Sequence, residues 1–176
     1  VNTFLSGDGE SLFGTAHPTI AGTFQNTLTT QADLNETSLE QSLIDIGQMT
    51  DERGLRVAAR GVKMIIPSEL QFTAERLMKS QGRTGTADND INAIVSMGMV
   101  PQGYRINNYL TDSDAFYIIT DVPNGMKMFT RAPLTTAMEG DFDTGNVRYK
   151  ARERYSFGVS DPRGCLLYTS PSPRDY

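Results

Sequence analysis

The side chains with the strongest intrinsic chemistry in this chain are few and lie far apart. Its 176 residues include one histidine, His17, and one cysteine, Cys165. Their wide separation does not fit a zinc site of the usual ligand spacing. His17 precedes a proline in an expected loop, which favours a hydrogen-bonded imidazole at the surface over a metal ligand or a general base.

Three closely spaced carboxylates, Glu139, Asp141 and Asp143, are the next candidates for chemistry. Asp141 and Asp143 alternate like the first ligands of an EF-hand loop, but Gly145 falls one place early and Arg152 stands where the bidentate glutamate belongs. A small acidic hydrolase using Glu139 and Asp143 is a distant alternative. The glycines near the N-terminus fit neither phosphate-binding fingerprint. We therefore expect no catalytic, cofactor-binding or metal-binding residues.

A row of cations lies near the C-terminus, in NVRYKARERYSFGV. In a strand, alternate residues point to opposite faces. One face would be mostly apolar and the other would carry Arg148, Lys150, Arg152 and Arg154. The row is either solvated and paired with acidic groups of the same fold, or it meets an acidic surface on a neighbouring subunit or DNA phosphates. The net charge of −5 lowers the expectation for DNA.

The elements that must position these residues alternate between helical and strand patterns. A helix is expected from Thr37, whose spacing to Glu40 fits a capping box, to about Gly54. A buried strand over 62–66 and a helix from Pro67 to Gly82 follow, and then a short helix within 90–98. Strands are expected over 104–110, 115–122 and 126–132, with a turn at 123–125 joining the last two. The fold class is α+β.

Composition and the N-terminal residues indicate where in the cell the protein is expected. The 38% hydrophobic and 21% charged residues are ordinary for a water-soluble domain, and no apolar run is long enough to span a membrane. The N-terminus lacks the series of a secretion signal, so we expect the protein to be intracellular when made. The chain begins with Val1, and we expect its natural N-terminus to lie upstream.

Several ordered motifs resemble one family. They are a strand, proline and helix ending in K-x-x-G-R, a Met-Gly-x-x-Pro element, D-x-x-x-G-M-x-x-F-x-R, a late A-R-E-R-aromatic strand and D-P-R-G. Their order over about residues 7–164 is similar to that in the C-terminal half of tailed-phage major capsid proteins of the Hong Kong 97 type. Each motif alone is weak, but the order is fairly specific.

The resemblance implies a fragment of the Hong Kong 97-like capsid fold. Residues 1–36 would be an extended segment linking the peripheral to the axial domain, 37–140 the axial domain, and 141–164 the returning strand of the peripheral domain. The protein would be a structural subunit of an icosahedral phage head, and not an enzyme. It would assemble with copies of itself in pentamers and hexamers around DNA that it does not bind specifically. The candidate contacts between subunits are Arg148, Lys150, Arg152, Glu153 and Arg154.

The same resemblance leaves partners and an alternative open. Scaffold, portal and decoration proteins are possible partners, the location would be the virion capsid and, during assembly, the host cytoplasm, and no membrane is involved. The alternative is the shell protein of a cellular nanocompartment with the same fold. Some family members cross-link through a Lys and Asn bond assisted by a Glu, but Arg152 precedes Glu153 here and the lysine partner would lie upstream, so we do not expect cross-linking.

The last twelve residues, CLLYTSPSPRDY, match neither a strand nor a helix. Reverse-translated, residues 165–175 resemble read-through of a transposase-based sequencing adapter. We therefore expect natural sequence to end near Gly164, residues 165–176 to be foreign and disordered, and Cys165 to carry no information about redox compartment. Genomic reads that continue past Gly164 into the same residues would refute this.

Overall fold

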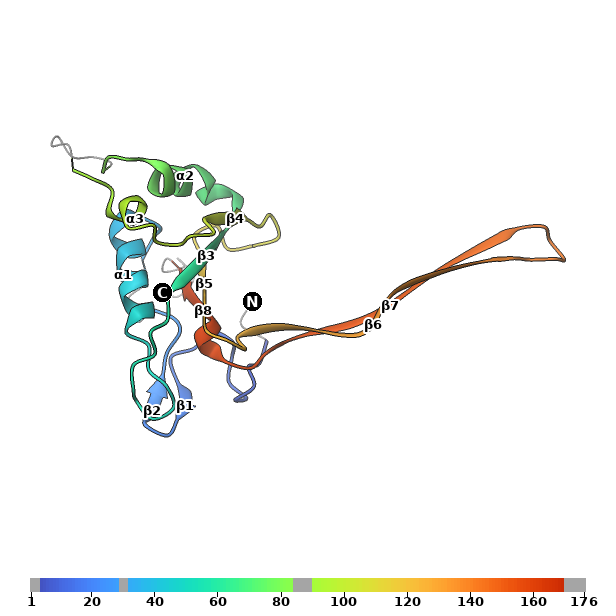
Figure 1. Cartoon of the computed structure of the whole chain (residues 1–176), viewed down its shortest axis with the longest axis horizontal. Helices are drawn as coiled ribbons and strands as arrows, with labels where there is room; N and C mark the ends of the chain where they lie inside the picture. Colours follow the sequence, from blue (N-terminus) through green and yellow to red (C-terminus); the bar gives the residue numbers. More distant parts are fainter. Residues whose placement is uncertain (1–3, 29–31, 84–89, 170–176) are drawn as a thin grey trace, which may run out of the picture.

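The computed structural model has two parts, a body and a long two-stranded arm that leaves it (Figure 1). It describes residues 4–28, 32–83 and 90–169. The arm consists of β6 (Met126–Gly140) and β7 (Val147–Val159), and the elements from β1 to β5 together with β8 form the body. Helices and sheets both contribute, which confirms the expected α+β class.

A four-stranded sheet in the order β4-β3-β5-β8 organises the body. β3 (Gly61–Ile66) pairs parallel with β4 (Tyr104–Ile106) and antiparallel with β5 (Phe116–Thr120), and β8 (Cys165–Tyr168) pairs antiparallel with β5. The central strands are apolar because both faces of the sheet are covered.

The main core lies between helix α1 and one face of this sheet. Leu39, Leu43 and Ile46 of α1 (Glu36–Gly47) recur at helical spacing and pack in one cluster with Met64 and Ile118 of the sheet. The opposite face holds a smaller cluster of Phe13, Ala115, Tyr117 and Cys165. None of the helices in the described residues has the length and apolar character needed to cross a membrane.

Helix α1 begins and ends earlier than the sequence predicts. Asn35 is the N-cap: its side chain accepts from the Ser38 amide at 2.8 Å, and its own amide donates to Ser38 Oγ at 2.9 Å. The predicted Thr37 and Glu40 box is therefore wrong, because a stronger cap stands two residues before Thr37. The helix stops at Gly47, well before Gly54, since the chain then folds into a turn around Asp51.

The remaining body elements are short. The predicted helix after Pro67 appears as a 3₁₀ turn, Ser68–Leu70, followed by α2 (Gln71–Lys79), and the next one as α3 (Ala93–Ser96). β1 (His17–Thr19) and β2 (Gly22–Phe24) form a small hairpin within the segment expected to be extended. A 3₁₀ turn, Pro162–Gly164, precedes β8.

The expected hairpin between 115–122 and 126–132 does not form. A turn does follow β5, where Asn124 has a φ of 66°, but β5 is already paired on both edges, with β3 and with β8. β6 therefore leaves the body and pairs with β7, far longer than the strand predicted over 126–132.

The start of the C-terminal segment is ordered, contrary to expectation. Residues Cys165–Tyr168 form β8, with Cys165, Leu166 and Tyr168 buried. Four apolar residues that follow the Pro162–Gly164 turn complete the open edge of β5, and their burial on both faces outweighs the weak strand pattern. Residues 170–176 lie outside the described part of the chain. The foreign origin of the segment stays a prediction.

Candidate interaction surface

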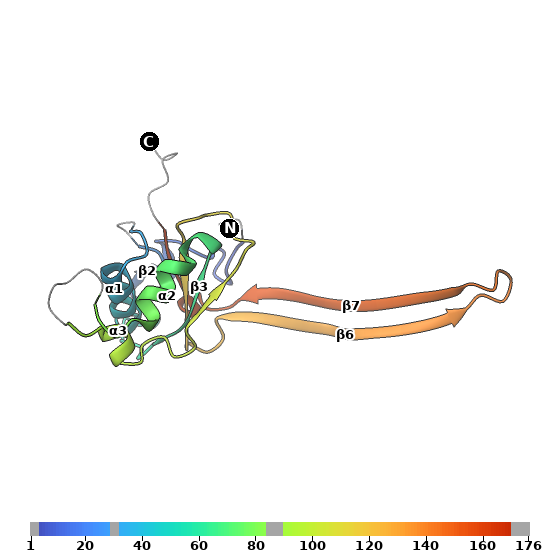
Figure 2. The same ribbon diagram turned by 90° about the horizontal axis from the view of Figure 1, so that it is seen from above.

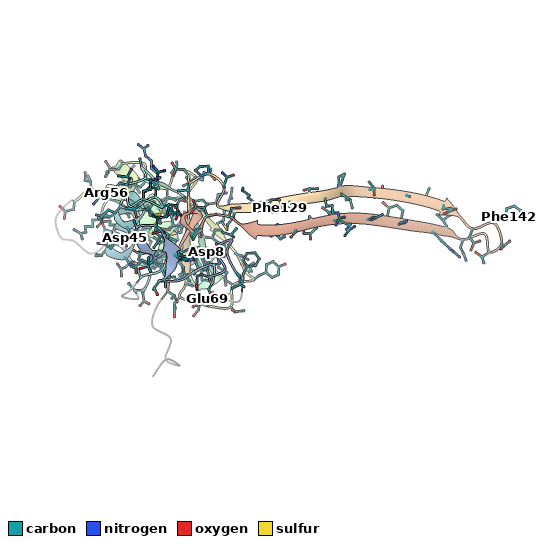
Figure 3. All side chains as sticks on the ribbon, turned by 90° about the horizontal axis from the view of Figure 1, so that it is seen from below. Asp8, Asp45, Arg56, Glu69, Phe129 and Phe142 are labelled. Atoms are coloured by element: carbon teal, nitrogen blue, oxygen red, sulfur yellow. The ribbon has the colours of Figure 1, made fainter. Side chains whose placement is uncertain are left out.

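The arm is an antiparallel hairpin whose side chains face solvent on both sides. Its strands pair from Met126 opposite Val159 to Gly140 opposite Val147, with two irregularities in β6 on the way. Figure 2 shows the hairpin projecting well beyond the body, and Figure 3 shows Phe129 near its base and Phe142 at its tip. Phe142 is fully exposed. Among the described residues, no body element covers either face of the outer part of the arm (Figure 2).

The three carboxylates that could suggest chemistry belong to the end of this arm. Asp141 accepts from Thr144 Oγ1 at 3.0 Å and from Arg148 Nη2 at 2.9 Å, and Gly145 supplies the positive φ of 67° that the turn needs. Asp143 stays exposed. Asp141 thus holds the turn, and in the described part of the chain no cluster of His, Cys, Asp and Glu could bind a metal ion.

The cationic row lies along one face of β7. Cross-strand partners share a face of the hairpin, and Arg148, Lys150 and Arg152 lie opposite Glu139, Ala137 and Thr135 respectively. Arg148 pairs with Asp141 at the tip. No other cation of the row forms an ion pair with any residue in the described ranges. The row therefore presents largely unneutralised charge.

Glu153 lies on the opposite face of β7 from the cations. It stands between Arg154, which pairs with Ala132, and Arg152, which pairs with Thr135. The register shifts between Thr130 and Ala132 and again between Ala132 and Thr135, so β6 contains two residues more than its partner over the paired length. Pro133 falls in the second irregularity, where its missing N–H removes a ladder hydrogen bond. Each bulge reverses the facing of β6, and the two together restore it.

The second face of the arm is apolar and exposed. Met128 lies opposite Phe157, and Met138 lies opposite Tyr149. The Tyr155 and Phe157 rings meet edge to face, 5.4 Å apart, yet Phe157 remains 62% exposed. The large exposed apolar residues of this face are Met126, Met128, Met138, Val147, Tyr149, Tyr155 and Phe157.

Such an arm is not self-sufficient. A two-stranded hairpin in water is marginally stable, and contiguous exposed apolar surface marks a site of contact with another surface. The arm therefore has the chemistry of an interaction surface, with an apolar face on one side and a cationic face on the other.

Two glycines set the base of the arm. A Cβ on Gly164 would lie 2.5 Å from the Gly125 Cα, and one on Gly125 would lie 2.7 Å from the Gly164 Cα. The Ser160 amide donates to the Gly125 carbonyl at 3.1 Å, and the Gly7 amide donates to the Val159 carbonyl at 3.0 Å. The backbones cross too closely for side chains at this point, which fixes where the arm leaves the body.

Arg163 ties the base to the body. Its side chain is buried, and its Nε donates to the Thr50 carbonyl at 2.6 Å. Nη1 reaches Glu52 at 3.1 Å and Asp161 at 3.2 Å, and the guanidinium lies 4.8 Å from the centre of the Phe24 ring. The D-P-R-G motif is thus a structural joint, a role that its sequence alone does not indicate.

His17 also lies at this joint, and the predicted surface imidazole is wrong. The residue is 1% exposed, its Nδ1 lies 2.6 Å from Asp8 Oδ2, and its Nε2 lies 3.3 Å from Asn26 Oδ1. The loop before β1 folds over the ring and buries it. A local sequence pattern carries no signal for this, because the partners come from separate turns.

A family model described as "Phage capsid protein" matches residues 2–168. No curated protein is significantly similar to the chain. Solved structures also match, and the chain spans between 52% and 60% of the length of the three described next. A virus-like particle from Pyrococcus furiosus matches with a TM-score of 0.50 and 10% identity over 81% of this chain and 55% of that one.

Two further matches are more distant in shape. A protein of Mycobacterium phage Che8 has a TM-score of 0.46 and 21% identity, over 81% of this chain and 52% of that one. The capsid of an empty GTA particle has a TM-score of 0.49 and 17% identity, over 97% of this chain and 60% of that one.

Proposed function

This chain belongs to the phage capsid protein family, and from that premise we propose that it is a structural subunit of an icosahedral phage head. The observation that carries the proposal is the solvent-exposed arm. Exposed apolar surface on a hairpin does not stabilise an isolated chain. In a symmetric assembly, each copy can bury this surface against a neighbouring subunit. The protein is structural and we assign it no catalytic role.

Charge supports a contact between copies. The arm, residues 126–159, carries six cations and four carboxylates and so has a net charge of +2. Because the whole chain has a net charge of −5, the rest of it has a net charge of −7. Complementary charge favours correct register between subunits more than raw affinity. We assign the contact to Arg148, Lys150, Arg152 and Arg154, with Glu153 on the opposite face.

The two parts of the chain fit the two domains implied by the Hong Kong 97-type resemblance. We assign the body to the axial domain and the arm to the peripheral domain. Because β6 and β7 form a single hairpin, we propose to place the division between the domains at Gly125 and not at 140. The 1–36 segment contributes β1 and β2 to the body.

The wider assembly follows from the same proposal. Copies would gather in pentamers and hexamers and enclose DNA without specific binding, with scaffold, portal or decoration proteins as additional partners and the host cytoplasm as the place of assembly. The family description favours a phage shell over a nanocompartment. Genes for portal and terminase beside the reading frame would support a phage, and a cargo enzyme gene would support a compartment.

The test is to express the reading frame completed from its genomic context and to examine it by negative-stain microscopy. Closed particles are expected. The quadruple variant Arg148→Glu, Lys150→Glu, Arg152→Glu, Arg154→Glu should remain folded and lose particles, because the cationic face then repels an acidic neighbour.

The matched control reverses exposed charge on the body, Arg53→Glu and Arg56→Glu, and should leave particles intact. Soluble monomers from the completed frame under all assembly conditions would contradict the proposal. Particles of the quadruple variant that match the parent would remove the assigned contact while leaving the shell function standing.

A further inference from the structure

The two outer edges of the arm differ in regularity. The arm is a two-stranded sheet, so each strand has one edge without a partner strand in the described part of the chain (Figure 2). The edge of β6 contains both register shifts and Pro133, which has no N–H to donate. The edge of β7 contains no proline and no shift. Bulges and prolines protect an edge against strand addition, so β6 is protected and β7 is open.

Hydrogen bonding at the base of the hairpin shows how the backbone of β7 is turned. The Ser160 amide donates to the Gly125 carbonyl at 3.1 Å, and these two residues flank the pair of Met126 and Val159. In an antiparallel ladder, a pair flanked by such a bond is not itself hydrogen-bonded. The N–H and C=O groups of Val159 therefore point away from β6, to the outer edge of the arm.

The tip gives the same result at the other end of β7. The Asp141 amide donates to the Asn146 carbonyl at 2.8 Å, and these residues flank the pair of Gly140 and Val147. The pleat has a period of two residues, and both irregularities belong to β6. Every odd-numbered residue of β7 therefore points its N–H and C=O groups to the outer edge.

One position of this edge is already filled. The Gly7 amide, from a separate segment, donates to the Val159 carbonyl at 3.0 Å. From Val147 to Phe157, no other segment in the described ranges bonds to the outer edge. These eleven residues, at about 3.3 Å each, form an open edge about 36 Å long. An exposed edge of this length is a template for pairing with another chain.

We propose that the outer edge of β7 binds an extended segment of a second copy of the chain as an added strand. The proposal rests on the shell function proposed above and specifies how one subunit holds the next. Main-chain hydrogen bonds supply affinity, and side chains at alternate positions supply specificity. An added strand would extend both faces of the arm, so we expect it to carry apolar side chains on one face and acidic side chains on the other.

The cations exclude β7 of the second copy as the added strand. Antiparallel pairing of β7 with itself places both cationic rows on one face of the new sheet. In a register centred on Glu153, which overlaps the whole strand, Arg152 lies opposite Arg154 of the other copy. Like charges directly opposite each other destabilise a sheet. Registers that separate the cations overlap less of the strand or reach Val159, where Gly7 already lies.

The added strand is therefore an acidic segment outside β7, which the rest of the chain can provide because it carries net negative charge. Contact between β7 and a different segment is heterologous. Heterologous contacts close copies into rings when the rotation between neighbours allows it. The geometry of the edge thus agrees with the pentamers and hexamers of the proposed shell.

Hydrogen exchange of single backbone amides tests the proposal. The completed chain is exchanged in D₂O as particles and as unassembled subunits, dissolved under quench conditions and read by NMR. In subunits, the even-numbered amides of β7 should exchange slowly because they face β6, and the odd-numbered ones quickly. In particles, the odd-numbered amides from Tyr149 to Phe157 should become protected on the order of tenfold or more.

The outer edge of β6 is the internal reference. Thr136 pairs with Ala151, and the N–H groups of Thr136 and Met138 point outward on the opposite edge. These two amides should stay unprotected in particles. Equal protection of both edges would indicate contact through the faces of the arm alone. That result, or particles without protection along β7, would overturn the proposal and leave the shell function standing.

A matched pair of proline variants completes the test. Ala151→Pro removes an outward N–H from β7, and Thr136→Pro removes one from β6, so neither removes a hydrogen bond between the two strands. In sedimentation velocity, Ala151→Pro should weaken association on the order of tenfold or more, and Thr136→Pro should leave it unchanged. Slow exchange of the Lys150 amide reports that the hairpin is intact in each variant.

Parent-like association of Ala151→Pro would overturn the proposal. If this variant loses the hairpin, the exchange pattern of the parent particles decides. Failure of the shell function has a different signature, since the completed chain then forms no particles at all, and it would overturn both proposals.

Discussion

At the scale of single residues, the close approach of Gly125 and Gly164 gives a direct prediction. Gly164→Ala places a methyl group against backbone that cannot move independently, because the facing atom is the Gly125 Cα. We expect a loss of about 1 to 3 kcal/mol in the free energy of unfolding. Gly140→Ala in the arm is the matched control, since nothing lies within 4 Å of its added Cβ.

Thermal and urea melts of both variants check this. Equal stability of Gly164→Ala and Gly140→Ala would mean that the crossing at the base is looser than the structure shows.

Arg163 is the second residue whose removal should be costly. Arg163→Met keeps most of the side-chain volume but leaves Asp161, Glu52 and the Thr50 carbonyl without their donor. We expect a loss of about 2 kcal/mol or more from the free energy of unfolding, discounted for the partial exposure of both carboxylates. Arg105→Met, at an exposed position of β4, should change it by less than about 0.5 kcal/mol. Chemical denaturation of the two variants side by side decides the point.

At the scale of elements, β8 predicts alkaline instability. Burial raises the pKa of the Cys165 thiol to about 12, and burial together with the Asp45 carboxylate raises the pKa of the Tyr168 hydroxyl. The folded chain then holds these protons where the unfolded chain releases them. Stability should be complete below the ordinary thiol value and fall as pH rises from about 9 toward 12.

Melting temperature measured across this range tests the expectation. Cys165→Ala should flatten part of the decline, whereas Tyr149→Phe on the exposed arm should leave it unchanged. A decline identical in the parent and in Cys165→Ala would mean that the thiol is not buried in β8, and Cys165 should then also react with a thiol reagent in the folded chain.

The elements differ in how far the sequence predicts them. Leu39, Leu43 and Ile46 repeat at helical spacing, and Val62 to Ile66 is a short apolar run, so α1 and β3 follow from local pattern. The partner of a strand is not local information. Asn124 and Gly125 make a turn as expected, but whether β6 pairs backward with β5 or forward with β7 depends on β8 occupying the edge of β5.

The same distinction holds for the site. Alternation along 147–159 predicted the two faces of β7, and the register with β6 agrees with that alternation. The joint at the base was not predictable from local pattern, because it joins the loops that hold Gly7 and Asn26 to a turn at Pro162, which lies 136 residues after Asn26. Their role exists only once separate loops meet.

At the scale of the whole molecule, the apolar face of the arm should matter to association and not to folding. Phe157→Ser removes a ring that is already exposed, so the free energy of unfolding of the isolated chain should change by less than about 0.5 kcal/mol. Association of the completed chain should weaken on the order of tenfold or more, because an aromatic side chain central to an interface is a typical hot spot.

Sedimentation velocity over a concentration series measures the effect. Ile20→Ser is the control, since Ile20 is 85% exposed but lies on the body. Equal weakening by both substitutions would indicate nonspecific adhesion of apolar surface and would argue against a contact made by the arm.

The base and the length of the arm together make a lever. Thirteen residues of β7 at about 3.3 Å each extend about 43 Å, so a rotation of about ten degrees at the crossing of Gly125 and Gly164 would displace the tip by about 7 Å. A change of a few tenths of an ångström among buried groups at the base is then amplified into a shift comparable to the width of a side chain at Phe142. Small rotations at this one joint would let the arm contact neighbouring subunits in parts of a shell with different curvature. The body and the hairpin would each keep their own shape.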